Sequence, residues 1–196
     1  MATPRHEIDF VYLLGSEQVQ AMAKEGRAAA KAGGVAAETL ADLSDCEVAA
    51  LHGYTDHSKP SGQNAYEFLN HALRKEDRRE LAALSPYIET IKSGLAKLPD
   101  YAGPVSRVTD LPAEVVKTLI PGKEYSDKGF MSTAAGLSDF RGKYMFFIES
   151  KTGKRIEFFS RYPDQREVLY TPGKEFKIVS VTPMANGMVE VVLKEV

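Results

Sequence analysis

The sequence predicts an α+β fold in which a helical N-terminal half packs on a core of strands formed by the C-terminal half. Up to about residue 119, helix-capping residues and apolar positions at helical spacing predominate. After Pro121 and Gly122, short apolar and β-branched runs alternate with turn residues instead. Helices and strands gathered in separate blocks indicate an α+β protein rather than alternating βαβ units.

Several stretches of the first half predict helices. Ser44 and Glu47 have the spacing of a capping box, and Ser85 followed by Pro86 is typical of a helix start. In residues 63–74, apolar positions at i, i+3, i+4, i+7 and i+8 form one stripe for burial. The expected helices span residues 16–31, 44–53, 63–74, 85–97 and 112–119.

Short runs that are apolar or β-branched, and bounded by turn residues, predict the strands. Asn186 and Gly187, between the last two runs, favour a tight hairpin turn. The expected strands span residues 105–108, 129–133, 144–149, 155–160, 167–170, 175–182 and 188–194.

The composition is that of an ordinary soluble globular protein. Over 196 residues, 25 Lys and Arg oppose 27 Asp and Glu, for a net charge of −2. This balance argues against binding nucleic acid mainly through phosphate neutralisation, which needs a basic face. The single cysteine, Cys46, excludes an internal disulfide and a cysteine-ligated zinc site. No run approaches the roughly 18 to 20 apolar residues of a spanning helix, and residues 1–15 lack the features of a signal peptide.

Few side chains indicate a catalytic device by themselves. All four histidines lie in the helical half, and the chain has no G-x-S-x-G elbow. His52, Asp56 and His57 are of types that bind metals, but a surface loop explains them better. The usual phosphate-binding loops, of the Walker or G-x-G-x-x-G type, are absent from the sequence.

Polar residues at the ends of expected strands remain as candidates. Arg107 ends the first strand, and Ser132 with Thr133 interrupts another. Gln165 and Glu167 are two residues apart at the start of a later strand, so they are expected to share a face. Each candidate also has a purely structural explanation. Arg107 is then a salt-bridged surface arginine, Ser132 and Thr133 are a hydrogen-bonded polar pair, and Gln165 and Glu167 belong to an exposed polar face.

In their order along the chain, five segments resemble the mono-ADP-ribosyltransferase family of the Arg, Ser-Thr-Ser, Glu type found in bacterial toxins. They resemble the family's tyrosine-threonine pair, its Y..iN..LR helix, its first-strand arginine, its Ser-Thr-Ser strand (here with alanine third) and its toxin turn with a Q-x-E motif. The segments are residues 53–55, 66–74, 104–107, 129–134 and 160–173. The resemblance, which extends from about Ala49 to the C-terminus, includes the Rho-modifying clostridial exoenzymes.

The resemblance implies a catalytic domain over residues 35–196 with a two-sheet antiparallel β core, and a helical N-terminal extension over residues 1–34. It implies that NAD+ binds as co-substrate, without a metal, and that ADP-ribose moves to a macromolecule with release of nicotinamide. The bond that breaks is N-glycosidic, so a carboxylate near the ribose would stabilise an oxocarbenium-like transition state.

By resemblance, Glu167 is that carboxylate and accepts a hydrogen bond from the 2′-hydroxyl of the nicotinamide ribose. Ser132, also part of the NAD site, would hold Glu167 in its productive rotamer. Arg107 and Arg74 would bind the pyrophosphate through planar, permanently charged guanidinium groups. The backbone at Val108 would hold the nicotinamide amide, where many members of the family carry glycine.

The resemblance places further residues in the NAD site. Tyr54 and Asn70 belong to it through their motifs. Phe140 and Arg141 are a hypothesis only, based on the loop 135–143, which lies where members of the family carry a mobile segment over the dinucleotide.

By resemblance, Gln165 is both a catalytic residue and a residue that recognises the acceptor. Arginine-modifying members of the family usually carry glutamate there, and a neutral amide can neither deprotonate a guanidinium nor form an ion pair with it. The resemblance therefore predicts a protein acceptor with a side chain other than arginine. Tyr162 matches an aromatic residue that the clostridial exoenzymes use to contact their target.

Three alternatives stay open: a nucleic-acid acceptor, NAD glycohydrolysis and an inactive binding module with the same fold. A group of basic residues near the acceptor loop favours nucleic acid, against the net charge: Lys151, Lys154, Arg155, Arg161 and Arg166. The toxin resemblance implies a secreted or injected effector that acts on a host or competitor-cell protein in the target-cell cytosol. An immunity protein is a further candidate partner.

Overall fold

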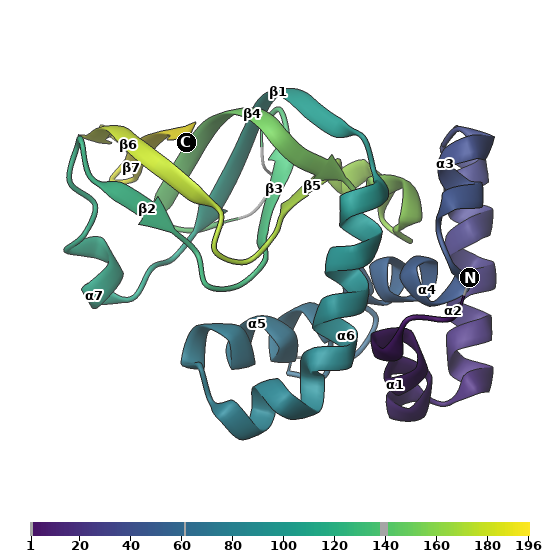
Figure 1. Ribbon diagram of the computed structural model, residues 1–196. Helices are drawn as coiled ribbons and strands as arrows, with labels where there is room; N and C mark the ends of the chain where they lie inside the picture. Colours follow the sequence, from purple (N-terminus) through teal and green to yellow (C-terminus); the bar gives the residue numbers. More distant parts are fainter. Residues whose placement is uncertain (1, 61, 138–140) are drawn as a thin grey trace. The chain divides into compact units, whose positions relative to one another are not determined.

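A computed structural model describes residues 2–60, 62–137 and 141–196 of the chain (Figure 1). The chain forms two compact units, one of residues 1–99 with 156–164 and the other of residues 100–155 with 165–196. We call them the helical unit and the sheet unit and describe each by itself. The boundary expected at Gly34 lies inside the helical unit and stays a prediction.

The helical unit is built on α2, α4 and α6. Helix α2 packs along α4, and both α1 and α4 pack on α6 (Figure 1). Gly26 allows the close approach of α2 to α4, since a Cβ there would lie 2.8 Å from a methyl carbon of Val48. The helices are α1 (Arg5–Leu14), α2 (Ser16–Ala32), α3 (Ala37–Asp42), α4 (Asp45–Tyr54), α5 (Ala65–Lys75) and α6 (Arg78–Lys97).

The capping box predicted for Ser44 and Glu47 is confirmed, with both reciprocal hydrogen bonds present. Helix α6 differs from the prediction, because it begins at Arg78 and contains Pro86 in its interior. Its cap is Asp77, whose carboxylate accepts hydrogen bonds from two backbone N–H groups of the first turn. Helices α1 and α3 were not predicted from the sequence.

The sheet unit contains a seven-stranded sheet in the order β1-β3-β5-β4-β7-β6-β2, with a further pairing of β1 to β4. The short helix α7 (Ala113–Val116) precedes β2. The strands are β1 (Asp100–Thr109), β2 (Glu124–Ser126), β3 (Met131–Ala135), β4 (Tyr144–Arg155), β5 (Glu167–Tyr170), β6 (Glu175–Pro183) and β7 (Val189–Glu195).

The predicted α+β class is confirmed, while the sheet differs from the expectation in two details. Strands β4 and β7 run parallel, whereas the other pairs are antiparallel. The two expected sheets are joined, because β1 pairs with both β3 and β4, and the end of β4 pairs with β5 at Lys154 and Arg155. The pairings of β1, β3, β5 and β4 thereby close on themselves.

The strand expected over residues 155–160 is wrong. Strand β4 continues to Arg155, and residues 157–159 then form a short 3₁₀ helix, η1 (Glu157–Phe159). Ile156 and Phe159 are fully buried in the helical unit, to which residues 156–164 belong. The apolar residues that predict a strand here are thus buried among helices instead.

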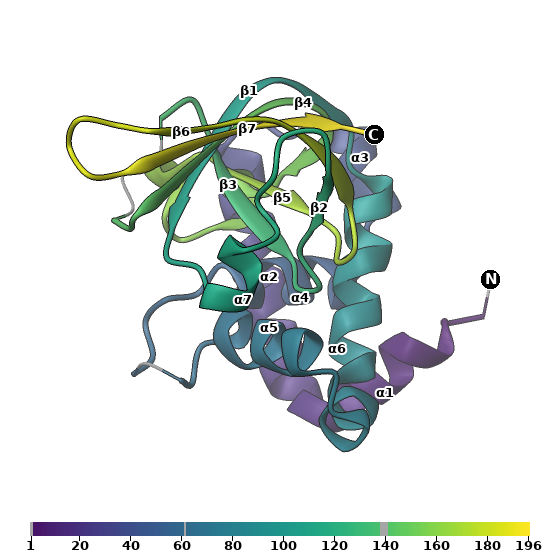
Figure 2. The same cartoon turned by 90° about the vertical axis from the view of Figure 1, so that its left-hand side faces the viewer.

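Of the remaining strands, β3, β6 and β7 lie within two residues of their predicted bounds, whereas β1 begins five residues before its predicted start and β2 was not predicted. Strand β5 has the predicted bounds, and the predicted hairpin of β6 and β7 is confirmed (Figure 2). Gly187 in its turn has φ of 84°, a left-handed conformation that glycine adopts without strain. Buried apolar residues of the strands, among them Phe146, Val168 and Phe176, form the core of this unit.

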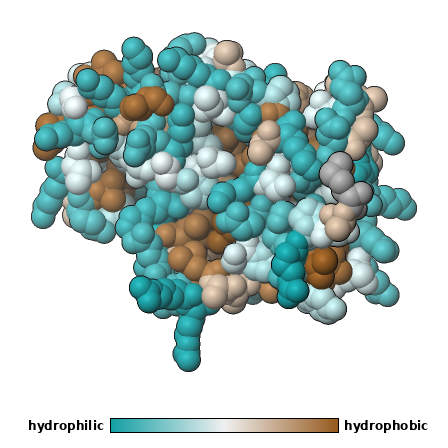
Figure 3. All heavy atoms as spheres, viewed as in Figure 1, coloured by the Kyte–Doolittle hydropathy of each residue, from teal (hydrophilic) through white to brown (hydrophobic). Residues whose placement is uncertain are grey.

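Hydrophilic residues cover most of the face that Figure 3 shows, and hydrophobic residues form separate patches on it. The exposed large hydrophobic side chains come from different elements, such as Tyr12 in α1, Leu137 after β3 and Val179 in β6. No helix in the described part of the chain is long and apolar enough to span a membrane.

Candidate active site

Ser132 and Glu167 are held next to each other by the pairing of β3 with β5. Glu167 lies opposite Ala134, two residues from Ser132, so both side chains are on the same face of the pair. The Ser132 hydroxyl donates a hydrogen bond of 2.5 Å to Oε1 of Glu167. Thr133, on the other face, is buried and donates to the backbone oxygen of Val168 at 2.7 Å. The predicted partnership of Ser132 and Glu167 is therefore present in the structure.

The Glu167 carboxyl lies in a strongly desolvated position, with only 7% of the residue exposed. Burial raises its pKa to about 7, although the hydrogen bond from Ser132 and the charge of Arg107 both lower it. A buried carboxyl with a pKa near neutrality is typical of catalytic positions. Glu167 is therefore a candidate catalytic carboxyl, and its role toward the ribose stays a prediction.

Arg107 is half-buried on β1 and bridges to β3. Its Nη1 donates to the backbone oxygen of Ser132 at 2.8 Å. Its Nε is buried and has no hydrogen-bond partner in the described part of the chain. A half-buried guanidinium that is permanently charged suits an anionic ligand such as a phosphate, and this predicted role of Arg107 stays a prediction.

The pairing of β1 with β3 is short. It covers Val105 opposite Ala135 and Ser106 opposite Ala134, whereas the pairing of β1 with β4 continues through Val108. In the described residues, β1 at Val108 is thus paired on its β4 side and not with β3. The role predicted for this backbone stays a prediction.

Gln165 and Glu167 do not share a strand face, contrary to the expectation. Gln165 ends a short 3₁₀ helix, η2 (Pro163–Gln165), and β5 begins only at Glu167. Between them, Arg166 has φ of 49°, a left-handed conformation that is uncommon for residues other than glycine. Its backbone oxygen accepts from Ala135 at 2.9 Å, and its guanidinium donates to the oxygen of Leu137 at 3.1 Å. The alternation of a strand therefore does not apply to Gln165.

The other predicted NAD-binding residues belong to the helical unit. Tyr54 is buried at the end of α4, and its hydroxyl accepts a hydrogen bond of 3.0 Å from Nδ2 of Asn70 on α5. Arg74 is exposed one turn after Asn70, so the two side chains share one face of α5. Tyr54 and Asn70 contact each other, and their roles toward NAD+ stay predictions.

Tyr162 lies in the segment before Gln165 and is 37% exposed. Its ring lies 5.5 Å from the ring of His57, which lies 4.7 Å from that of Tyr66 on α5. Arg141 is exposed after β3, and Phe140 is outside the described residues.

A cluster of polar residues around this segment was not predicted from the sequence. Arg161 and Glu25 form an ion pair, and both lie beside the buried ring of His52. These residues are far apart in the sequence and belong to no local motif. From the sequence, a surface loop explains His52 better than a metal site, whereas the residue is buried on α4 and its Nδ1 donates to the backbone oxygen of Phe159 at 2.6 Å.

Glu167 on β5 accepts a hydrogen bond from Ser132 on β3, and Arg107 lies on the adjacent strand β1. These three residues belong to the motifs that occur in this order along the sequence. The model of a family described as NAD:arginine ADP-ribosyltransferase matches residues 16–196. The chain belongs to the NAD:arginine ADP-ribosyltransferase family.

Two curated members of this family are named NAD(+)--protein-arginine ADP-ribosyltransferase Tre1. The one from Serratia proteamaculans is 33% identical over 187 residues, which cover 93% of this chain and 39% of the relative. The one from Pseudomonas putida is 36% identical over 161 residues, covering 79% of this chain and 30% of the relative. The chain thus corresponds to less than half the length of these relatives.

Solved structures of other ADP-ribosyltransferases have the same fold. HopU1 of Pseudomonas syringae matches with a TM-score of 0.79 at 20% identity, covering all of this chain and 98% of that one. The C3 exoenzyme of Clostridium limosum matches with a TM-score of 0.65 at 21% identity, covering 89% of this chain and 94% of that one. At such identities these structures support the fold, and the resemblance to clostridial exoenzymes is confirmed at that level.

Proposed function

We propose that this chain is a mono-ADP-ribosyltransferase that transfers ADP-ribose from NAD+ to a protein side chain. The observation that carries the proposal is the buried Glu167, hydrogen-bonded by Ser132 and close enough to Arg107 to sense its charge. The family match over residues 16–196 supports the same activity.

In the proposed reaction, the bond between C1′ of the ribose and the nicotinamide nitrogen breaks, and nicotinamide leaves with the electron pair. Ionised Glu167 stabilises the oxocarbenium-like ribose and accepts a hydrogen bond from its 2′-hydroxyl. The acceptor then attacks C1′ and loses a proton. Glu167 serves only in its charged form, so its ionisation sets the pH at which transfer begins.

Positively charged and polar side chains make up the proposed NAD+ site. Arg107, whose guanidinium is planar and permanently charged, would contact the phosphate oxygens. Arg74 would add a second cation from α5, with Tyr54 and Asn70 beside it. One neighbouring structure, exoenzyme S from Pseudomonas aeruginosa, is described as bound to carba-NAD, with a TM-score of 0.73 at 21% identity. A metal plays no part in the proposed reaction.

Two observations disagree on the acceptor residue. Gln165 favours an acceptor other than arginine, because an amide cannot neutralise a guanidinium. The family description and the names of the two relatives favour arginine. We place arginine first, since a relationship over most of the chain outweighs a single position. An amide or other neutral side chain is the second candidate.

The proposed setting is that of a bacterial effector acting inside a target cell on a host or competitor-cell protein. The type III effector XopAI of Xanthomonas axonopodis matches this chain with a TM-score of 0.76 at 20% identity. An immunity protein would be a natural partner in competition between bacteria.

The decisive experiment uses labelled NAD+ with and without a cell lysate, and compares the wild-type chain with Glu167→Ala. Nicotinamide release and incorporation of label into macromolecules are measured together. Label that enters protein only with intact Glu167 supports the proposal, and mass spectrometry then identifies the modified residue. Label in nucleic acid, with strong salt dependence, would favour that acceptor instead. Nicotinamide release without incorporation of label would indicate a glycohydrolase. The absence of Glu167-dependent turnover would indicate an inactive binding module.

A further inference from the structure

Residues 156–164 leave the sheet unit between two of its strands and return just before the catalytic strand. They follow β4, which ends at Arg155, and they precede Gln165, two residues before Glu167. This segment, which we call the excursion, belongs to the helical unit. Contacts that fix the position of the excursion therefore also restrict the backbone that leads directly into Gln165.

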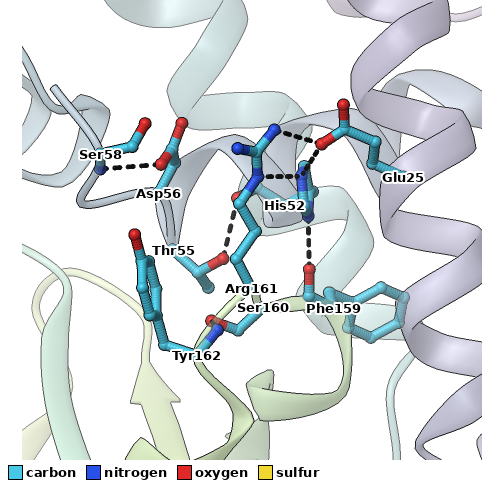
Figure 4. Close-up of polar contacts among 9 residues, drawn as sticks. All are labelled: Glu25, His52, Thr55, Asp56, Ser58, Phe159, Ser160, Arg161 and Tyr162. Atoms are coloured by element: carbon cyan, nitrogen blue, oxygen red, sulfur yellow. Dashed lines mark hydrogen bonds and ion pairs between the residues drawn. The ribbon is translucent and has the colours of Figure 1, made fainter.

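The first part of the excursion is anchored by apolar burial and one buried hydrogen bond. Phe159 is fully buried, and its backbone oxygen accepts from Nδ1 of His52 at 2.6 Å (Figure 4). Phe158 packs on the C-terminal end of α2, where a Cβ at Gly33 would lie 2.8 Å from its ring. Helices α2 and α4 thus both hold the excursion at η1.

The second part is anchored by charge. The guanidinium of Arg161 forms an ion pair with the Glu25 carboxylate, which projects from α2 (Figure 4). The same carboxylate lies 3.3 Å from Nε2 of His52, and Nε of Arg161 lies 3.5 Å from that nitrogen. Burial would raise the pKa of Glu25, but hydrogen bonds from Arg161 and His52 lower it, so the group stays a carboxylate.

The geometry around this cluster restricts its movement. His52 is 3% exposed, and α2 approaches α4 closely at Gly26, the residue after Glu25. An isolated exposed ion pair contributes only about 0–1 kcal/mol. Here Glu25 lies on α2, which packs closely on α4, and its carboxylate also contacts the buried ring of His52. The ion pair therefore fixes the position of Arg161 more strongly than its small contribution to the free energy of unfolding suggests.

Tyr162 follows immediately. Its backbone N–H donates to the Ser160 hydroxyl at 2.9 Å, and its ring lies against His57. Arg161 projects toward Glu25 and His52 while Tyr162 projects away from them (Figure 4). The anchored arginine therefore fixes the direction of the partly exposed tyrosine beside it.

We infer that Glu25, His52 and Arg161 form a positioning network that holds the excursion, with Tyr162, in the conformation that presents the acceptor. The inference rests on the proposed transferase function and extends it to a helix that contains no predicted site residue. None of the three is a catalytic residue. They act through the backbone of the excursion, so they affect transfer to the acceptor and leave the cleavage of NAD+ in its absence unchanged.

The test compares Glu25→Gln, Arg161→Gln and the charge-reversed pair Glu25→Arg with Arg161→Glu. Each single variant should lower transfer to protein about tenfold, because small displacements of a positioned group cost that much in rate. Nicotinamide release without acceptor should stay within about twofold of wild type, since Glu167 is untouched. The charge-reversed pair should recover most of the transfer.

The matched control is Asp45→Asn. It removes an ion pair of 2.7 Å with Arg27, which also lies on α2 but donates its other hydrogen bonds to the backbone oxygens of Leu40 and Leu43. This variant should transfer ADP-ribose like wild type. Its melting temperature, measured with those of the other variants, shows whether a change in transfer merely follows lost stability.

The outcomes separate this inference from the proposed function. Loss of Glu167-dependent turnover in the wild-type chain would count against the function itself. Normal transfer in both single variants, or equal loss of transfer and nicotinamide release, would overturn the positioning network. Backbone amide hydrogen exchange at residues 160–165 tests the inference without an activity measurement. Exchange should be faster in the single variants and return to the wild-type rate in the charge-reversed pair. Unchanged exchange in the single variants would overturn the inference.

Discussion

The Ser132 hydroxyl donates a hydrogen bond of 2.5 Å to the Glu167 carboxylate across the β3–β5 pair. This bond favours the charged form of a carboxyl whose burial otherwise favours the neutral form. Ser132 thus does two things: it orients Glu167 and it keeps the pKa of Glu167 from rising further. The two effects can be separated by measuring rate as a function of pH.

Replacing Ser132 by alanine should move the pH dependence of transfer. The pKa of Glu167 is about 7 with the bond present. Without it we expect the acidic limb of kcat/KM, which reports the free enzyme, to shift upward by about one pH unit. The matched control is Thr133→Val, which removes a hydroxyl bonded to the Val168 backbone and should lower the melting temperature without moving the limb. An unshifted limb in Ser132→Ala would mean that the bond does not set the ionisation of Glu167.

Replacing Glu167 by glutamine should abolish transfer and also stabilise the fold at alkaline pH. In the folded chain its pKa is about 7, above the ordinary value of 4.5. Between these values the folded state binds more protons than the unfolded state, so the wild type loses stability as pH rises through this window. At about pH 8, Glu167→Gln should therefore be more stable by on the order of 1–3 kcal/mol. Denaturant unfolding at acid and alkaline pH checks this, and an equal difference at both would contradict it.

Local patterns correctly predicted that three of the candidate residues lie on strands. Ser132, Glu167 and Arg107 lie on short strands whose neighbours in the sequence mark them, and the pairing of those strands brings them together. Gln165 was misplaced because nothing in the sequence marks Arg166 as left-handed. Glycine or asparagine would have indicated such a turn.

Contacts between distant segments were beyond the reach of the sequence. His52 and Phe159 are separated by 107 positions, and Glu25 and Arg161 by 136. Neither pair has a spacing that a helix or strand period would reveal, so only the folded chain shows them together. Pro86 caused a different error. The sequence predicts a helix that begins at this residue, but Pro86 lies inside α6, whose N-terminal cap is Asp77.

Replacing Arg107 by lysine should weaken NAD+ binding although the charge is kept. Lysine cannot form a planar fork with two phosphate oxygens. We expect the KM for NAD+ to rise about tenfold, equivalent to roughly 1.4 kcal/mol. Arg141→Ala is the companion variant, since Arg141 is exposed in the loop after β3. Unchanged NAD+ binding in Arg141→Ala would remove that residue from the site, and unchanged binding in Arg107→Lys would remove the phosphate role of Arg107.

Replacing Gln165 by glutamate should decide between the two candidate acceptors. A carboxylate at this position can pair with an arginine guanidinium and take up its proton, which the native amide cannot do. If arginine is the acceptor, as we place first, Gln165→Glu should keep transfer to arginine and raise its rate several-fold. Gln165→Ala is the control and should lower transfer while leaving nicotinamide release intact, because Glu167 is unchanged. Loss of transfer in Gln165→Glu with normal nicotinamide release would instead indicate a neutral acceptor, for which a second carboxylate only adds a charge that must be desolvated.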